Sequence, residues 1–101
     1  MCFYNRVIVY TILYRDYRGI VMTLNDEVAK RIIKLLKERN MTNYRLERKS
    51  GILHGALDRI LNGQNKTVTL TTIFKLARGF DMTYMEFLDD DVFRSELIEI
   101  D

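Results

Sequence analysis

Two short amphipathic segments joined through a glycine constrain the fold of this chain more than any other feature of its sequence. Thr42 is placed to cap the first segment, which ends near Ser50 and Gly51, where a residue tolerant of positive φ permits a sharp reversal. The second segment has helical apolar spacing and stops at Asn62 and Gly63. Its inward positions hold Ala56, Leu57, Ile60 and Leu61. The pattern predicts two short helices connected by a tight turn.

Three further helices are predicted around this pair. A long amphipathic helix begins near residue 24, where Asn25 can cap it, and ends at Asn40, which tolerates the left-handed backbone. Another begins after the cap Thr69, and a short one begins after Thr83, which stands three residues before a glutamate in capping-box spacing. The chain has no proline, so Gly, Asn and Thr end and begin its helices. These signals predict an all-α fold of five helices.

The length of 101 residues suits one domain, which we place at residues 22–91. Residues 92–101 form an acidic C-terminal tail. Residues 1–21 include the β-branched and aromatic run 7–14, which is too short to span a membrane and predicts a short N-terminal β-strand extension. Such a strand would pair with the same segment of a second chain or pack on the helices. Alternatively, Met22 is the natural start and the preceding residues are only a translated leader.

Charge is divided unevenly along the chain. Residues 22–80 contain twelve lysine or arginine residues and five acidic residues, a net charge of +7, whereas residues 81–101 carry −7. A basic body is typical of a protein that binds a polyanion, although it is also compatible with a solvated surface that has no partner. Cys2 is the single cysteine, so no internal disulfide can form, which favours a reducing, cytoplasmic compartment.

An ordered series of residues runs from residue 24 to residue 88: short helix, glycine turn, short helix, Asn-Gly stop and two capped helices. Its members are Thr42, Leu46, Ser50-Gly51-Ile52, Leu57, Ile60, Leu61-Asn62-Gly63, Leu70 with Ile73 and Leu76-Ala77, and the ending Thr83, Glu86, Phe87, Leu88. This series resembles the Cro and lambda-repressor family of helix-turn-helix DNA-binding domains. The resemblance implies a five-helix lambda-repressor-like fold that binds double-stranded DNA.

The second helix of a helix-turn-helix enters the major groove with its first turns toward the base edges, so its outward residues must be polar or small. Four residues fit this requirement: His54, Gly55, Asp58 and Arg59. Arg59 can donate to O6 and N7 of guanine, and Asp58 can accept from N4 of cytosine or orient Arg59. His54 can bond to a base or a phosphate, while Gly55 leaves room where backbone and DNA approach closely.

Three further residues are expected to bind the DNA backbone by similarity to the family. They are Asn43 at the start of the first helix of the pair, Asn62 after the reading helix, and Lys66 in the polar loop 64–68. Contacts of this kind set the register of a protein on DNA, whereas base contacts set the sequence that it selects.

Each of these residues also has a simpler interpretation. His54 can be a surface histidine with no special role; no second His or Cys cluster supports it as a metal ligand. Arg59 and Asp58 can form a surface ion pair of little energetic value. Asn62 can serve only to stop a helix. The methionine and aromatic residues between 74 and 87 are expected to be core rather than a ligand pocket.

Four positions depart from the family pattern. Glu47 replaces a small residue where the two helices pack closely, which could alter their angle or spacing. Leu53 replaces a Ser or Thr cap of the reading helix, a loss of about 1 kcal/mol. Gly55 and Gly79 replace residues that favour helix. These departures bear on the accuracy of base reading more than on the fold.

The leading functional hypothesis is a sequence-specific transcriptional regulator, a repressor that binds two operator half-sites as a homodimer. The alternative is an antitoxin-like or adaptor module on the same fold, which uses the acidic tail 89–101 to dock on a protein. Catalysis is not expected, because one histidine and one cysteine offer no nucleophile and base at a useful spacing. Neither a cofactor nor a metal is expected, and no membrane association.

Overall fold

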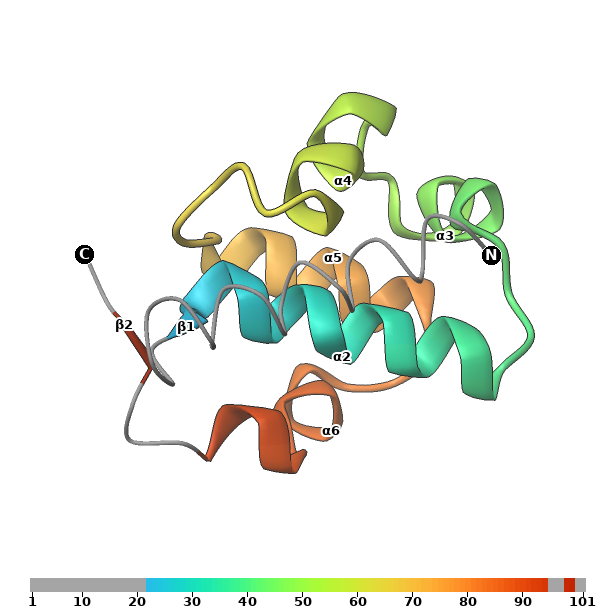
Figure 1. Cartoon of the computed structure of the whole chain (residues 1–101). Coiled ribbons are helices and arrows are strands. Elements are labelled where there is room, and N and C mark those ends of the chain that lie inside the picture. Colours follow the sequence, from blue (N-terminus) through green and yellow to red (C-terminus); the bar gives the residue numbers. More distant parts are fainter. Residues whose placement is uncertain (1–21, 95–97, 100–101) are drawn as a thin grey trace.

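The computed structural model of the chain describes residues 22–94 and 98–99. Five α-helices make up most of it (Figure 1): α2 (Leu24–Glu38), α3 (Asn43–Ser50), α4 (His54–Leu61), α5 (Leu70–Gly79) and α6 (Tyr84–Leu88), followed by a 3-10 turn, η1 (Asp91–Phe93). The predicted all-α fold of five helices is thus confirmed. The strand predicted within residues 1–21 lies outside the described residues.

Two very short strands join the ends of the described chain. Strand β1 (Met22–Thr23) pairs in parallel with β2 (Ile98–Glu99), with Met22 opposite Ile98. The sequence does not predict this pairing, because two residues are too few to show an alternating pattern. The pairing brings Ile98 and Glu99 beside the start of α2.

Local capping sets the beginning of most helices, as the sequence predicts. The hydroxyls of Thr42, Thr69 and Thr83 each accept a hydrogen bond from the backbone amide three residues later, which satisfies one amide of the first turn. Thr83 and Glu86 form the predicted capping box. Asn40, with φ of 52°, takes the predicted left-handed conformation after α2.

The predicted cap of α2 is wrong. Thr23, rather than Asn25, caps this helix, because its hydroxyl accepts from the amide of Asp26 while the Asp26 carboxylate accepts from the amide of Thr23. Asn25 lies in the first turn, fully buried, and its Nδ2 donates to the carbonyl of Ile60 at 2.9 Å. This hydrogen bond therefore links the end of α4 to the start of α2.

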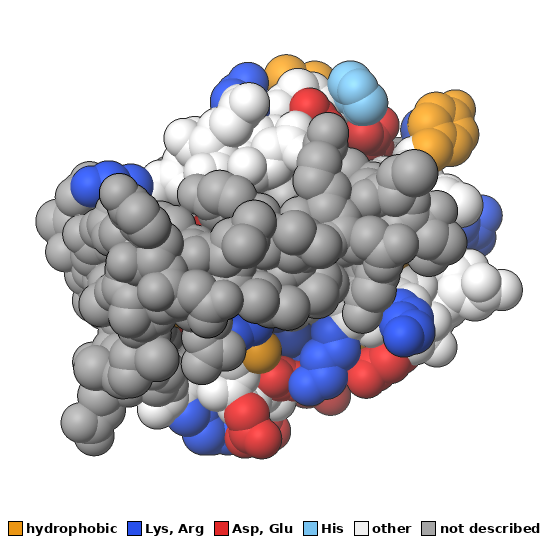
Figure 2. All heavy atoms as spheres, viewed as in Figure 1, with side chains coloured by type: hydrophobic (Ala, Val, Ile, Leu, Met, Phe, Trp, Pro, Cys, Tyr) orange, Lys and Arg blue, Asp and Glu red, His pale blue; other side chains and the backbone are white. Residues whose placement is uncertain are grey.

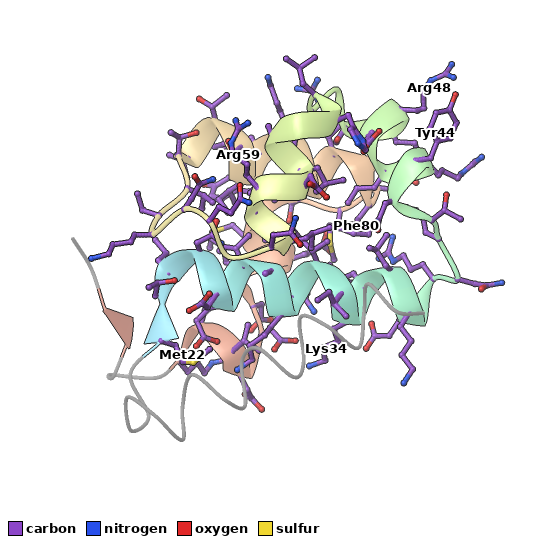
Figure 3. The ribbon with its side chains drawn as sticks, turned by 45° about the horizontal axis from the view of Figure 1, so that its top comes forward. Met22, Lys34, Tyr44, Arg48, Arg59 and Phe80 are labelled. Carbon is purple, nitrogen blue, oxygen red and sulfur yellow. The ribbon has the colours of Figure 1, made fainter. Side chains whose placement is uncertain are left out.

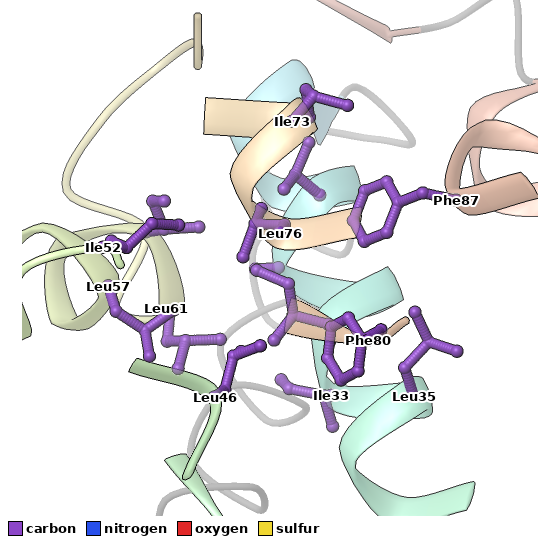
Figure 4. Close-up of a cluster of buried hydrophobic side chains, with 14 of the residues drawn as sticks. Ile33, Leu35, Leu46, Ile52, Leu57, Leu61, Ile73, Leu76, Phe80 and Phe87 are labelled. Atoms are coloured by element: carbon purple, nitrogen blue, oxygen red, sulfur yellow. The ribbon is translucent and has the colours of Figure 1, made fainter. Parts of the chain in front are cut away.

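The hydrophobic core lies between α2 and the other helices (Figure 4). Leu46, Leu57, Leu61 and Leu76 are almost completely buried. The rings of Phe80 and Phe87 stack with centroids 6.4 Å apart, and Phe93 packs on Phe87 at 6.1 Å. Phe93 is partly buried and belongs to the segment expected to be a tail, so the start of that segment packs against the core.

Arg31 connects α2 to the end of α6. Its guanidinium donates to the carbonyls of Phe87 at 2.8 Å and Glu86 at 3.0 Å and to the Asp90 carboxylate at 2.9 Å. Burial raises the pKa of Asp90, but the hydrogen bonds from Lys34 and from the Val92 amide, with the charge of Arg31, outweigh burial and leave that pKa below its ordinary value. At this helix end, Arg31 thus satisfies the carbonyl of Phe87 and is a second donor, beside the amide of Asp89, to the carbonyl of Glu86.

Candidate nucleic-acid interface

The turn between α3 and α4 is built as the sequence predicts. Gly51 ends α3 in the left-handed region, with φ of 80°, and its amide donates to the carbonyl of Glu47. The Ser50 hydroxyl accepts from the amide of Ile52 at 3.2 Å. Ser50 and Ile52 are buried, whereas Leu53 is 80% exposed. The chain therefore returns to the surface where α4 begins.

The first turns of α4 are open to solvent. His54, Gly55, Asp58 and Arg59 are all exposed, although the opposite face of the helix is buried through Leu57 and two neighbouring apolar residues. Leu53 makes no side-chain cap, as predicted from its apolar character. The α4 ribbon lies at the outer edge of the molecule in Figure 1, above α2 and α5. The structure thus brings the four predicted base-reading residues together on one exposed helix face.

Gly55 and Arg59 are neighbours one turn apart on α4. A Cβ atom built on Gly55 would lie 3.5 Å from Nη1 of Arg59, so the guanidinium reaches back along the helix over this glycine. Figure 3 labels Arg59 beside α4, with Tyr44 and Arg48 projecting from α3. The distance is an ordinary van der Waals contact, so packing against the residues that the structure describes does not require a glycine at residue 55.

Asp58 is held by Asn62 rather than by Arg59. Nδ2 of Asn62 donates to Oδ2 of Asp58 at 3.1 Å, one turn along α4. Among the described residues, no ion pair joins Asp58 to Arg59, so the simple surface ion pair considered above is not formed. Asn62 also ends α4, in agreement with its predicted role as a helix stop.

His54 contacts Glu47 across the turn. Nδ1 of His54 lies 2.7 Å from Oε2 of Glu47, and the His54 side chain is 82% exposed while that of Glu47 is 15% exposed. The histidine, in pale blue, lies at the surface with acidic side chains beside it in Figure 2. The hydrogen bond to Glu47 and the Glu47 charge raise the pKa of His54 above 6.5, against a smaller opposing effect of burial.

The residues predicted to bind phosphate lie at the start of α3, at the end of α4 and in the loop that follows α4. Asn43 is the first residue of α3, directly after the cap Thr42, and Asn62 follows α4. Lys66 is exposed in the following loop, and its carbonyl accepts from the backbone amide of Asn25 at 3.1 Å. Because Asn25 also holds the end of α4, one buried residue positions both α4 and the loop.

Two features of the interface were missed by the sequence analysis. Nη1 of Arg48 donates to the hydroxyl of Tyr44 at 2.7 Å, and the guanidinium lies over the ring, 5.6 Å from its centroid, on the exposed side of α3. An exposed tyrosine among three basic residues was the available signal. Leu53 was treated only as a missing cap, yet its exposed side chain beside His54 is apolar surface that could meet a thymine methyl group.

Two other kinds of site receive no support from the described residues. Within residues 22–94, no three His, Cys, Asp or Glu side chains gather in a way that could hold a metal ion. No helix in the described part of the chain has the length and apolarity to cross a membrane.

Comparison with known protein families gives one match. The model of the Cro/C1-type HTH (helix-turn-helix) DNA-binding domain matches residues 31–91. No curated protein and no solved structure matches the chain significantly.

Proposed function

Because the chain belongs to the family of Cro/C1-type helix-turn-helix DNA-binding domains, we propose that it is a sequence-specific transcriptional repressor that occupies an operator as a dimer. The proposal depends on one observation: small and polar residues lie on the solvent-exposed face of the first turns of α4. A helix of this kind fits the major groove, where every base pair presents a distinct pattern of donors and acceptors.

The base-reading roles follow from the chemistry of each side chain. Arg59 presents paired N–H groups for O6 and N7 of guanine, and its position over Gly55 keeps it close to the helix axis. Asp58, steadied by Asn62, is an acceptor for N4 of cytosine. The described residues give no packing reason for a glycine at residue 55, which supports a close approach of DNA at this position.

Backbone binding is assigned to residues around this face. We assign phosphate contacts to Asn43, Asn62 and Lys66. The Tyr44 and Arg48 pair on α3 is added to this set, because the first helix of the motif crosses the DNA backbone. The net charge of +7 over residues 22–80 supports attraction to a polyanion.

An exposed apolar patch supports dimer formation. We call it the α5–α6 patch; it consists of Leu70, Phe74, Tyr84 and Met85. The expectation that Phe74, Tyr84 and Met85 belong to the core is wrong, because their side chains are exposed. The Phe74 and Tyr84 rings contact each other with centroids 4.4 Å apart, yet both remain more than a third exposed. A second copy that covers this surface would form the dimer that two operator half-sites about one helical turn apart require. A repressor of this kind would act in the cytoplasm, where its operator lies.

The alternative of an antitoxin-like or adaptor module has weaker support. Its docking segment was the acidic tail, but Phe93 of that segment packs on Phe87 and Arg94 pairs with Asp89 and Asp91 within the same chain. A partner would have to displace these contacts.

Salt dependence distinguishes DNA binding from protein partnership. We expect the affinity for double-stranded DNA to fall by two or more orders of magnitude between about 50 and 200 mM salt, because each phosphate contact releases condensed counterions. Fluorescence anisotropy with a labelled random duplex measures this slope. A flat response, or no binding at low salt, contradicts the proposed function and favours the adaptor.

Substitutions at two basic residues should distinguish contacts with the bases from contacts with the DNA backbone. Arg59→Ala is expected to relax discrimination at one base pair by about 1 to 3 kcal/mol, whereas Lys66→Ala should weaken binding to all sequences alike and reduce the salt slope by about 1. Competition between duplexes that differ at single positions measures both effects. Equal behaviour of the two variants would show that α4 does not read bases as proposed.

A further inference from the structure

We infer that Glu47 is a positioning residue that lets His54 read different bases in its two protonation states. The inference rests on the proposed function, since it concerns how α4 reads DNA. It starts from the hydrogen bond that joins α3 to the first residue of α4.

The Glu47 carboxylate fixes which ring nitrogen of His54 faces outward. An ionised carboxylate can only accept, so Nδ1, 2.7 Å from Oε2, carries a proton in both the neutral and the charged ring. Glu47 is largely enclosed between the helices, whereas the imidazole is 82% exposed. The ring is therefore held at Nδ1 and presents Nε2 to whatever approaches α4.

Nε2 changes its hydrogen-bonding character when the ring gains a proton. In the cation it donates, which suits N7 or O6 of guanine; in the neutral ring with Nδ1 protonated it accepts, which suits the amino groups of cytosine N4 or adenine N6. A free imidazole would exchange tautomers or rotate and present either nitrogen. Because Glu47 holds Nδ1 and removes that freedom, the protonation state of His54 determines which base its Nε2 prefers.

The charged groups near His54 raise the pKa that governs this change above its ordinary value. Glu47 on α3 raises the pKa of His54 by its hydrogen bond and by its charge, and Asp58 on α4 raises it slightly. The phosphates of bound DNA act in the same direction. The cation therefore prevails below the raised pKa, and the neutral ring prevails as pH rises through it.

The first test measures the free protein. His54 is the single histidine, so its imidazole NMR signals can be followed without ambiguity during a pH titration. Glu47→Gln keeps an acceptor for Nδ1 but removes the charge, and we expect it to lower the His54 pKa measurably. Glu38→Gln, an exposed carboxylate at the end of α2, removes the same charge elsewhere and should leave the pKa unchanged. Equal titration of all three proteins would overturn the inference.

The second test measures base preference by selecting sites from a random duplex pool at about pH 6 and about pH 8.5. We expect one position in each half-site to change from guanine toward cytosine or adenine, by about fivefold or more in relative affinity. His54→Ala should remove this change, and Glu47→Gln should move it to lower pH. A uniform loss of affinity with rising pH would identify His54 as a phosphate contact and overturn the inference, as would a preference independent of pH. Absence of DNA binding at every pH would refute the proposed function itself.

Discussion

Replacing Arg31 with methionine is expected to lower the free energy of unfolding by about 3 to 5 kcal/mol. Methionine preserves most of the apolar stem, but it removes the donors to the two carbonyls at the end of α6 and to the Asp90 carboxylate. Removing one partner of a buried charge pair is costly, and the Arg31 side chain is only 8% exposed, whereas Lys34, the lysine that would still pair with Asp90, is 48% exposed. Because the whole stability of a domain is about 5 to 15 kcal/mol, urea denaturation should show a large decrease in midpoint.

Lys34 provides the matched control for Arg31. Its ammonium donates to the same Asp90 oxygen at the same distance of 2.9 Å, but the Lys34 side chain is 48% exposed. Lys34→Met should therefore cost less than about 1 kcal/mol, as exposed pairs usually do. Similar losses in the two variants would show that the charge pair, rather than the satisfaction of the helix end, stabilises this corner of the fold.

Replacing Gly79 with alanine is expected to lower the free energy of unfolding by about 1 to 3 kcal/mol, although alanine favours helix by about 1 kcal/mol. A Cβ at Gly79 would lie 2.8 Å from Cδ1 of Leu46, 2.9 Å from Cβ of Ser50 and 3.3 Å from Cα of Ser50. Leu46 can rotate away, but the Ser50 backbone precedes the Gly51 turn and cannot move without shifting α3. The glycine therefore permits α3 and α5 to pack closely.

Gly55→Ala is the control, because it makes the same chemical change in another helix. Of the described residues, a Cβ there meets Arg59 alone, at 3.5 Å, and residue 55 is exposed. We expect this variant to be as stable as the parent or up to about 1 kcal/mol more stable. Urea denaturation of both variants, with circular dichroism to verify helix content, makes the comparison. A Gly79→Ala protein as stable as Gly55→Ala would refute the close-packing explanation.

Features that depend on a few adjacent residues were predictable from the sequence. The caps at Thr42, Thr69 and Thr83, the left-handed Asn40 and the Gly51 turn all involve contacts within three or four residues. The exposure of the reading face also followed, because apolar spacing indicates which side of a helix is buried.

Contacts between distant residues could not be predicted from such signals. Asn25 has the composition of a cap, but Thr23 and Asp26 form a reciprocal pair, and Asn25 bonds the carbonyl of Ile60 instead, 35 residues away. Gly79 appeared only to weaken a helix until its distance to Ser50 was known. Likewise, Glu47 appeared as a misplaced large residue, although its carboxylate is directed at His54.

The amino-acid sequence by itself determined that this chain forms five helices with a glycine turn before the reading helix, since each signal acts through the backbone of its own segment. Only the tertiary structure decided which side chains contact one another at that helix: Glu47 contacts His54, Asn62 contacts Asp58, and Arg59 lies over Gly55. The physical reason is that a side chain of four to seven atoms has several partners within reach along its own helix and across a turn. Packing of the buried core selects one partner by fixing the position of α4 relative to α2, α3 and the loop that follows.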